Sequence, residues 1–322
     1  MPPGEVWFPN RPMTQQAGGE DRASPMISGT TALIGLLGQP VSHSLSPVMH
    51  NAALEAMALD WRYMAFPCDA EDLKAVLDGL QAVGCRGLSV TIPHKQQVVG
   101  LCRELSPLAK RLGAVNTLTP LKEGGWHGHN TDMEGFLAPL QMQAEQWQGA
   151  EAVVLGCGGS ARAVVAGLQQ LPLTAIHVAG RRPDALADFL NDLRAGQGSD
   201  SAPLIAMSFD PEPLSRVLQR SKLVVNTTPV GMQGHGDDNA MPLGSDLWAG
   251  VDASMTLYDL IYTPRPTPWL ALGQQRGCRT IDGLEMLVQQ GAAALRRWSG
   301  RADVPVDQMR EGALRSLNAH QA

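Results

Sequence analysis

The sequence lacks two features that nucleic-acid-binding and membrane proteins need, a surplus of basic residues and a long apolar run. Its 25 Lys and Arg are outnumbered by 31 Asp and Glu, which gives the 322 residues a formal net charge of −6. Nucleic acids and anionic membrane surfaces select clustered Lys and Arg, and a membrane-spanning helix needs about 20 apolar residues. No uncharged apolar stretch approaches that length. We therefore expect a small-molecule partner, with no nucleic acid and no membrane.

Cysteine is scarce and its spacing excludes the common metal motifs. The five cysteines, Cys68, Cys85, Cys102, Cys157 and Cys278, form no Cys-x-x-Cys pair and have no histidine at metal-ligand spacing. The histidines near the later motifs, His43, His94, His127 and His129, show no His-Glu-x-x-His pattern either. We expect free thiols in a reducing, cytoplasmic compartment, and no metal.

Residues 1–25 also lack the marks of a targeting segment. They are rich in Pro, Gly and Gln. They contain neither the apolar stretch of a secretory signal nor the Arg-rich composition of a transit peptide. We expect them to be a disordered extension.

From residue 31 onward, apolar strands alternate with helix-length segments. Strands are expected over 31–37, 61–66, 87–92, 114–118 and 125–129, and helices over 46–57, 69–84 and 106–112. The first helix is expected to have Ser46 as its N-cap, and the second to begin at Asp69 and stop at Gly84. This alternation predicts an α/β fold with a largely parallel sheet, and the length suits two domains.

A second run of the same kind begins near Ala150 and contains a glycine-rich turn. Gly156, Gly158 and Ala161 give the spacing Gly-x-Gly-x-x-Ala between an apolar strand and a helix. The first glycine permits a sharp turn, the second lets a pyrophosphate approach the backbone, and the small third residue lets helix and strand pack closely. We therefore expect a dinucleotide on the N-terminus of this helix.

The end of the next strand indicates which dinucleotide is bound. Sites specific for NAD carry an acidic residue there, but this strand ends in Gly180, Arg181 and Arg182, and the first acid is Asp184. Guanidinium groups pair well with a 2′-phosphate. The sequence therefore favours NADP over NAD.

Eight motifs, taken together and in order, resemble those of the shikimate dehydrogenase family. They are HSLSP at 43–47, TIPHK at 91–95, GAVNT at 113–117, HNTDMEG at 129–135, GCGGSARAV at 156–164, NTTPVGM at 226–232, YDLIYTPRPTP at 258–268 and DGLEMLVQQ at 282–290. The resemblance covers roughly residues 31–300. It implies an NADPH-dependent, reversible reduction of 3-dehydroshikimate to shikimate in aromatic amino-acid biosynthesis.

The resemblance also assigns roles to residues of this sequence. Lys95 matches the catalytic lysine and Asp132 its partner carboxylate. The substrate-binding positions are Ser44, Ser46, Thr91, Asn116, Asp132, Tyr262 and Gln290. The cofactor-binding positions are Gly156, Cys157, Gly158, Gly159, Ser160, Gly180, Arg181, Arg182, Leu260 and Gly283.

The same resemblance implies a domain plan with a cleft between two domains. Residues 26–131 and 283–322 would form the N-terminal α/β domain that binds substrate, and 132–282 the Rossmann domain that binds NADP. The protein would be a monomer or a homodimer.

A lysine beside a carboxylate suits the implied chemistry. As hydride reaches the carbonyl carbon, the carbonyl oxygen gains negative charge, which an ammonium at Lys95 can stabilise before it supplies the proton. Asp132 would hold that ammonium in place. Pro93 ends the strand ladder and so directs the residues after it away from the sheet.

Three positions depart from the common family pattern. Ser89 stands where many bacterial members have an Asn that contacts substrate hydroxyls. The turn Gly180-Arg181-Arg182 replaces the usual Asn-Arg-Thr, and Leu260 replaces a frequent Met. Three alternatives stay open: a quinate/shikimate dehydrogenase with broader substrate or NAD use, another lysine-bearing NADP dehydrogenase of similar architecture such as methylenetetrahydrofolate dehydrogenase, and a non-catalytic NADP sensor on the same scaffold.

Overall fold

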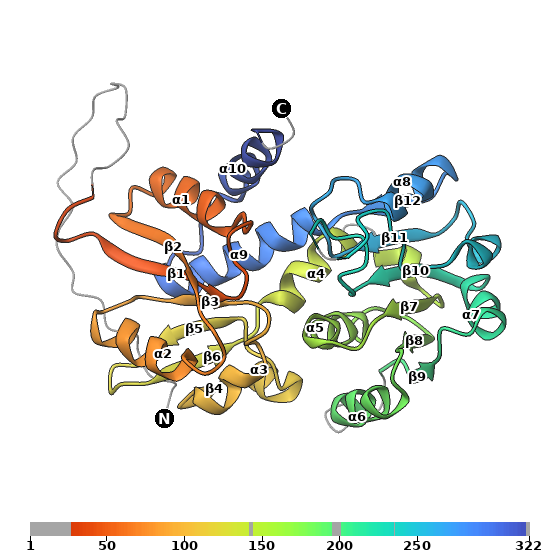
Figure 1. The fold of residues 1–322 in the computed structure, drawn as a ribbon, viewed down its shortest axis with the longest axis horizontal. Helices are drawn as coiled ribbons and strands as arrows, with labels where there is room; N and C mark the ends of the chain where they lie inside the picture. The colour runs from red at the N-terminus through yellow and green to blue at the C-terminus, as the bar shows by residue number, and fades with distance from the viewer. Residues whose placement is uncertain (1–26, 142–143, 195–200, 235, 320–322) are drawn as a thin grey trace.

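The chain forms two six-stranded sheets, one in each of two lobes that lie side by side in Figure 1. This computed structural model describes residues 27–141, 144–194, 201–234 and 236–319. The extension predicted over residues 1–25 lies outside these ranges. Within them, no helix is both long and apolar enough to cross a bilayer.

The first sheet has the strand order β2-β1-β3-β5-β6-β4. Its strands are β1 (Ala32–Gly38), β2 (Trp61–Pro67), β3 (Leu88–Val90), β4 (Glu104–Leu105), β5 (Thr117–Pro120) and β6 (Trp126–His129). β1 is parallel to both β2 and β3, but β5 is antiparallel to β3 and β6. β5 and β6 are joined by a turn with Gly124 and Gly125 at positive φ, and so short a connection can join only antiparallel strands.

The helices around this sheet partly follow the expected boundaries. They are α1 (Ser46–Ala56), α2 (Leu73–Ala82) and α3 (Pro107–Leu112), with a short 3-10 turn η1 (Gln97–Leu101). The predicted Ser46 cap is wrong: Leu45 is the N-cap, and the Ser46 amide donates to Ser44 Oγ at 3.2 Å. α2 begins after Asp69 because residues 69–72 first form a turn, closed by the Asp72 amide and the Asp69 carbonyl. Gly84, at φ +78°, follows the end of α2 as expected.

The second sheet is entirely parallel, with the order β12-β11-β10-β7-β8-β9. Its strands are β7 (Glu151–Leu155), β8 (Ala175–Ala179), β9 (Leu204–Met207), β10 (Ser221–Asn226), β11 (Thr256–Asp259) and β12 (Arg279–Ile281). The order reverses between β7 and β10, which is the dinucleotide-binding arrangement. The connecting helices are α5 (Gly159–Leu168), α6 (Pro183–Arg194), α7 (Pro211–Leu218) and α8 (Pro268–Gln275), with the 3-10 turns η2 (Ala144–Trp147) and η3 (Ser245–Gly250).

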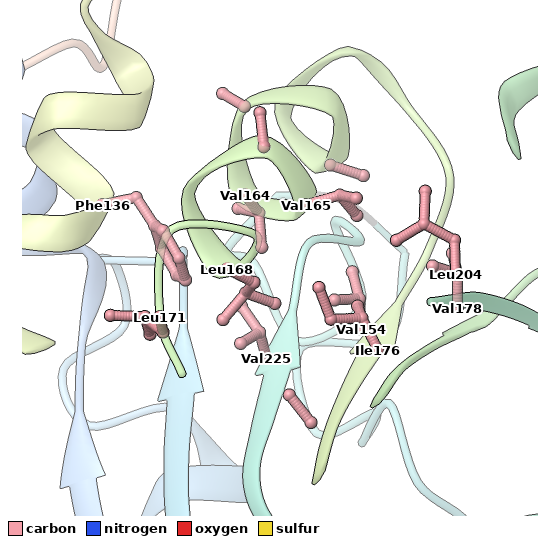
Figure 2. Packing of buried hydrophobic residues seen from close by; sticks show 14 of the residues in the cluster. Phe136, Val154, Val164, Val165, Leu168, Leu171, Ile176, Val178, Leu204 and Val225 are labelled. Atoms are coloured by element: carbon pink, nitrogen blue, oxygen red, sulfur yellow. The ribbon is translucent and has the colours of Figure 1, made fainter. Parts of the chain in front are cut away.

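Apolar side chains of α5 fill the space above the second sheet. Val164, Val165 and Leu168 pack on strand residues such as Val154 and Val225, as Figure 2 shows. Phe136 of α4 (Asp132–Gln141) joins the same cluster. α4 therefore contributes to the core of the second lobe.

Two C-terminal helices return to the first lobe. α9 (Gly283–Ser299) contacts α1, α4 and β5, while α10 (Val306–Ala319), which the sequence analysis did not anticipate, packs against α1 (Figure 1). The indole of Trp298 in α9 donates to the carbonyl of Leu118 in β5 at 3.0 Å. α9 thus covers the first sheet although it follows the last strand of the second. The two-lobed α/β fold confirms the predicted fold class.

Candidate active site

Lys95 and Asp132 form a close ion pair in the first lobe. Nζ of Lys95 lies 2.7 Å from Oδ2 of Asp132, and their side chains are only 13% and 6% exposed. The segment after β3 is held by the backbone, because the Thr91 amide donates to Leu37 and the Lys95 carbonyl accepts from the Val115 amide. Lys95 therefore lies in the turn that follows a central strand, as its position after Pro93 predicts.

Asp132 is held on three sides. Its Oδ1 accepts from Asn116 Nδ2 at 2.8 Å, and its backbone amide donates to Asn130 Oδ1 at 3.1 Å. Lys95 occupies the other carboxylate oxygen. A carboxylate with both oxygens used cannot rotate without breaking a hydrogen bond, so its orientation toward Lys95 is fixed.

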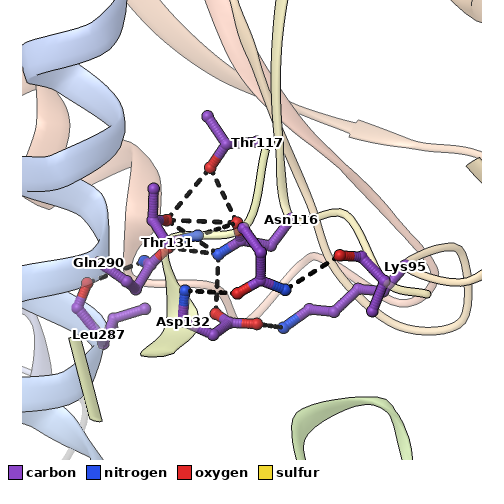
Figure 3. Close-up of polar contacts among 9 residues, drawn as sticks. Lys95, Asn116, Thr117, Thr131, Asp132, Leu287 and Gln290 are labelled. Atoms are coloured by element: carbon purple, nitrogen blue, oxygen red, sulfur yellow. Dashed lines mark hydrogen bonds and ion pairs between the residues drawn. The ribbon is translucent and has the colours of Figure 1, made fainter. Parts of the chain in front are cut away.

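Asn116 is the centre of the network drawn in Figure 3. Its Oδ1 accepts from the Thr131 amide at 2.8 Å and from the Thr117 hydroxyl at 2.9 Å. Its Nδ2 also lies 3.3 Å from Oε1 of Gln290, whose own Nε2 donates to the Leu287 carbonyl. The structure thus brings four of the predicted residues, Lys95, Asn116, Asp132 and Gln290, into one hydrogen-bonded group.

The other predicted substrate residues lie nearby without joining that group. Ser44 and Ser46 are linked to each other at the start of α1. Thr91 precedes Lys95 and packs against Gly38, where an added Cβ would lie 2.3 Å from Thr91 Cγ2. Tyr262 follows β11 and packs on the first lobe's core, and burial raises its pKa. In the part of the chain that the structure describes, no hydrogen bond joins these four side chains to Lys95 or Asp132.

Two buried hydroxyl groups near these residues were not anticipated as a pair. Ser89 of β3 and Tyr63 of β2 are 5% and 2% exposed, yet among the described residues Ser89 Oγ and the Tyr63 hydroxyl have no hydrogen-bond partner. Burial raises the pKa of Tyr63, and its neighbours Ser89 and Ser46 oppose that rise without reaching full hydrogen-bond geometry. A buried hydroxyl without a hydrogen-bond partner destabilises the folded protein, and a polar ligand bound here would supply that partner. Tyr63 and Ser89 come close because their strands lie on either side of β1. No local sequence signal predicts that strand order.

The glycine turn has the geometry that its spacing predicts. Gly156 has φ +105°, and an added Cβ would lie 2.7 Å from Thr227 Oγ1, so only glycine fits. Gly158 is the N-cap of α5 and has no side chain to cap the first-turn amides. An added Cβ at Gly158 or Gly159 would meet nothing within 4 Å. Open amides at a helix N-terminus fit a phosphate group.

The remaining residues of this turn lie along the same edge of the second sheet. Cys157 and Ser160 flank the two open glycines. An added Cβ at Gly180 would lie 3.3 Å from Cys157 Sγ, so the turn after β8 lies beside the turn after β7. Arg181 and Arg182 in this second turn are exposed. Two guanidinium groups therefore lie at the position where NADP-binding sites contact the 2′-phosphate.

Leu260 and Gly283 meet where the two lobes join. An added Cβ at Gly283 would lie 2.0 Å from the Leu260 carbonyl oxygen. The preceding residue, Asp259, is fully buried and accepts hydrogen bonds from Asn226, Thr267 and the Ile261 amide. Asp259 was not predicted from the sequence, because Asn226 and Thr267, which hold its side chain, lie in other segments of the chain.

Among the residues that the structure describes, no group of three or more His, Cys, Asp and Glu side chains is placed to hold a metal ion. The site instead offers an ammonium, a carboxylate, side-chain amides, hydroxyls and an unobstructed helix N-terminus. This set can bind a hydroxylated anion beside a dinucleotide.

Two family models match parts of the chain. The shikimate dehydrogenase substrate binding domain matches residues 36–118, and the shikimate 5′-dehydrogenase C-terminal domain matches residues 283–313. A shikimate dehydrogenase (NADP(+)) from Synechocystis is 50% identical over 294 residues, which cover 91% of this chain and 98% of that protein. The chain belongs to the shikimate dehydrogenase family.

Solved structures of the family share its fold. A shikimate 5-dehydrogenase from Thermus thermophilus, in complex with NADP(H) and shikimate, has a TM-score of 0.76 and 33% identity over 89% of this chain and all of that one. A quinate dehydrogenase from Corynebacterium glutamicum, in complex with NAD, has a TM-score of 0.78 and 28% identity over 88% of this chain and 99% of that one. The shikimate dehydrogenase fold thus serves more than one substrate and cofactor.

The matched segments of the shikimate dehydrogenase family models contain only part of the candidate site. Ser44, Ser46, Thr91, Lys95 and Asn116 fall in the first match, and Gly283 and Gln290 in the second. Asp132 and the glycine turn fall in neither. Their assignment depends on the ion pair with Lys95 and on the open start of α5.

Proposed function

We propose that this protein is an NADP-dependent shikimate dehydrogenase that reduces 3-dehydroshikimate to shikimate reversibly in aromatic amino-acid biosynthesis. The observation that carries the proposal is the largely buried ion pair between Lys95 Nζ and Asp132 Oδ2 at 2.7 Å. It offers one proton donor whose position is fixed by a carboxylate that Asn116 and Asn130 hold in turn. General acid catalysis requires such a fixed donor within reach of the reacting oxygen.

In this proposal Lys95 stabilises the oxygen that gains charge and then protonates it. NADPH, when bound, supplies the hydride. Asp132 keeps the ammonium beside the substrate oxygen and accepts a hydrogen bond from the neighbouring hydroxyl. In the reverse direction Lys95 removes the hydroxyl proton. The low exposure of both side chains keeps water from weakening their interaction.

The surrounding polar residues would bind the substrate. Ser44 and Ser46, at the start of α1, are suited to donate to its carboxylate, helped by the helix dipole. Thr91, Asn116, Tyr262 and Gln290 would contact its hydroxyls. The unpaired hydroxyls of Ser89 and Tyr63 support a ligand rich in hydroxyl groups, because a ligand hydroxyl would give each the partner it lacks.

NADP would lie along the carboxyl edge of the second sheet. Gly156, Cys157, Gly158, Gly159 and Ser160 would hold the pyrophosphate, and Gly180, Arg181 and Arg182 the 2′-phosphate. Leu260 and Gly283 would contact the nicotinamide end. The open amides of α5 and the exposed arginine pair support this placement.

We also propose the domain division 26–131 plus 283–322 for substrate and 132–282 for NADP. The packing of Leu284, Val288 and Leu295 into the core that contains Ile34 supports the return of the C-terminal segment. The protein would work in the cytoplasm as a monomer or homodimer. Its acidic net charge favours a small-molecule partner over nucleic acid or membrane.

The test is to measure kcat/KM for shikimate and for quinate, each with NADP+ and with NAD+. We expect the highest value for shikimate with NADP+. Comparable turnover of quinate or with NAD+ would support the broader quinate/shikimate alternative, which the structural likeness to a quinate dehydrogenase in complex with NAD makes worth testing. NADP binding without turnover of either substrate would contradict the proposal and favour the sensor.

A further inference from the structure

A cavity of about 640 Å³ lies beside the candidate active site in the first lobe. It is open to solvent and is lined by β4, the start of α3, the end of β6 and the C-terminal part of α9. Its volume falls in the range of small-molecule sites, which is about 300–1,000 Å³. None of the residues given a role above, apart from Asn130, contributes to its wall.

Arg297 supplies an unneutralised charge to this cavity. Within the described part of the chain the guanidinium forms no ion pair, and its one hydrogen-bond contact is Nη1 to His129 Nδ1 at 3.5 Å. The neighbouring Arg296 instead pairs with Glu134 and lies outside the cavity wall. An arginine with free N–H groups on a cavity wall is suited to bind a carboxylate in bidentate geometry.

His129 adds a second donor to the same wall. Burial, followed by the nearby His127 and Arg297, lowers the pKa of His129 to about 3, so its ring is neutral. Because Nδ1 faces the Arg297 donor, Nε2 carries the ring hydrogen. Nε2 has no partner among the described residues. The ring also stacks obliquely on His127, with centroids 4.1 Å apart, which keeps it in place.

The charge of Glu104 does not cancel that of Arg297. Its Oε2 lies 3.8 Å from His127 Nδ1, and the side chain is 57% exposed. Glu104 thus lies at the solvent-exposed rim, and its contact with His127 is an ion pair only when that imidazole is protonated. Glu104 is the one carboxylate among the residues that line the cavity, and it forms no ion pair with Arg297.

Part of the cavity wall is apolar. Leu105, Pro107 and Leu108 line it, and no charged side chain stands among these three. A ligand that fills this space would have an apolar body against them and an anionic group toward Arg297. Binding sites for small molecules commonly combine such an apolar lining with a few converging polar groups.

The cavity is separate from the reacting groups. Arg297 lies two helical turns beyond Gln290 on α9, which places their Cα atoms about 10 Å apart along the helix. Asn130 stands between the two regions, because it lines the cavity and its Oδ1 accepts the Asp132 amide. We propose that this cavity is a second binding site, which takes a small carboxylate with an apolar body.

The experiment is isothermal titration calorimetry of the full-length protein with benzoate and with benzamide, its neutral analogue, in a phosphate-free buffer. Shikimate is present without NADP+, so that no turnover occurs. We expect benzoate to bind and benzamide to bind at least about tenfold more weakly, a difference of about 1.4 kcal/mol. Equal binding of the two, or no benzoate binding in the millimolar range, would overturn the proposal.

The matched variants are Arg297→Gln and Arg296→Gln, which remove neighbouring charges of which only one faces the cavity. Arg297→Gln should weaken benzoate about tenfold or more, whereas Arg296→Gln should change it less than about twofold. Equal effects of the two variants would contradict the proposed contact. Thermal unfolding of both variants checks that each is folded.

A crystal of the unmodified protein soaked in 4-bromobenzoate, with no shikimate present, shows where the carboxylate ligand binds. Anomalous signal from bromine between Leu108 and Arg297 would support the proposal. Signal found only beside Lys95, or nowhere, would overturn it.

Discussion

The backbone of Gly283 lies against the carbonyl of Leu260 so closely that an added Cβ would stand 2.0 Å from the Leu260 oxygen. The Gly283 amide also donates to the Ile261 carbonyl at 3.0 Å. The first residue of α9 is thus fixed to the segment that leaves β11. Because α9 carries Gln290 and Leu260 follows the second sheet, this contact sets the relation between substrate-side and cofactor-side residues.

Gly283→Ala should therefore destabilise the protein. The methyl group would displace a backbone carbonyl, and overpacking of this kind costs about 1–3 kcal/mol. We expect a lower urea midpoint and weaker NADP binding, measured by chemical denaturation and by fluorescence titration. The control is Gly79→Ala in α2, where an added Cβ meets nothing within 4 Å and helix propensity favours alanine by up to about 1 kcal/mol. Equal stability of the two variants would contradict the steric argument.

Lys95→Ala should lower kcat by about 10²–10⁴-fold, because it removes the proposed acid. The Kd for NADP should stay within about twofold, since Lys95 bonds to Asp132 and to no residue of the glycine turn. The kcat is measured by absorbance at 340 nm, and the Kd is measured by titration with NADP. The control is Lys74→Ala, which breaks the exposed pair with Asp78 and should leave kcat unchanged. Equal loss of NADP affinity and kcat in Lys95→Ala would show a structural or nucleotide-binding role instead.

Arg181→Ala should discriminate between the two cofactors. Loss of a charge-assisted contact to a 2′-phosphate should weaken NADP+ by about tenfold to a hundredfold and leave NAD+ nearly unchanged. Arg216→Ala in α7, an exposed residue paired with Glu212 on the same helix, is the control. The measurement is KM for each cofactor at saturating shikimate. A similar change for NAD+ and NADP+ would remove the argument for a 2′-phosphate contact.

Asp259 should make stability depend on pH. Burial raises the pKa of Asp259 from 3.8 to about 7, while hydrogen bonds from Ile261, Thr267 and Asn226 oppose the rise and nearby Asp282 adds to it. Between these two values the unfolded chain releases the proton and the folded protein keeps it. Stability contributed by this group is therefore fully present below pH 3.8 and is lost as pH rises through about 7.

We expect the free energy of unfolding to fall by roughly 3 kcal/mol from pH 5 to pH 8 on account of this residue. Asp259→Asn cannot ionise, so it should remove that share of the pH dependence even if it lowers stability throughout. Urea denaturation of both proteins at the two pH values measures the difference. Parallel pH dependence in the two proteins would show that Asp259 is already ionised at pH 5.

Much of the fold could be predicted because it depends on local signals. Alternating apolar strands and helices gave the α/β class, and the spacing of Gly156 and Gly158 identified the strand, turn and helix that open the second sheet. These features need only residues close in sequence. The Lys95 and Asp132 pairing came from the family resemblance, and the structure shows that the two side chains do meet.

The rest depends on contacts between distant segments. Ser46 has the residue type of an N-cap, but Ser44 takes its amide, so the preceding loop decides where α1 begins. Tyr63 and Ser89 meet only because β1 separates their strands by one position. The hydrogen bonds of the Asp259 carboxyl group likewise come from distant residues, Asn226 and Thr267. Such partners are set by sheet order and register, which no short motif records.

The position of Asp132 at the first residue of α4 has a mechanical consequence. α4 packs against α9 of the first lobe and α5 of the second, while Lys95, Asn116 and Asn130 tie down its starting residue. The other end of α4 is packed into the core of the second lobe, so if the lobes rotate toward each other that end moves with the second lobe and the first residue of α4 moves least. The Asp132 carboxylate is then the part of α4 that moves least relative to Lys95. Closure over a ligand can therefore bring the nucleotide-binding side closer without separating the ion pair.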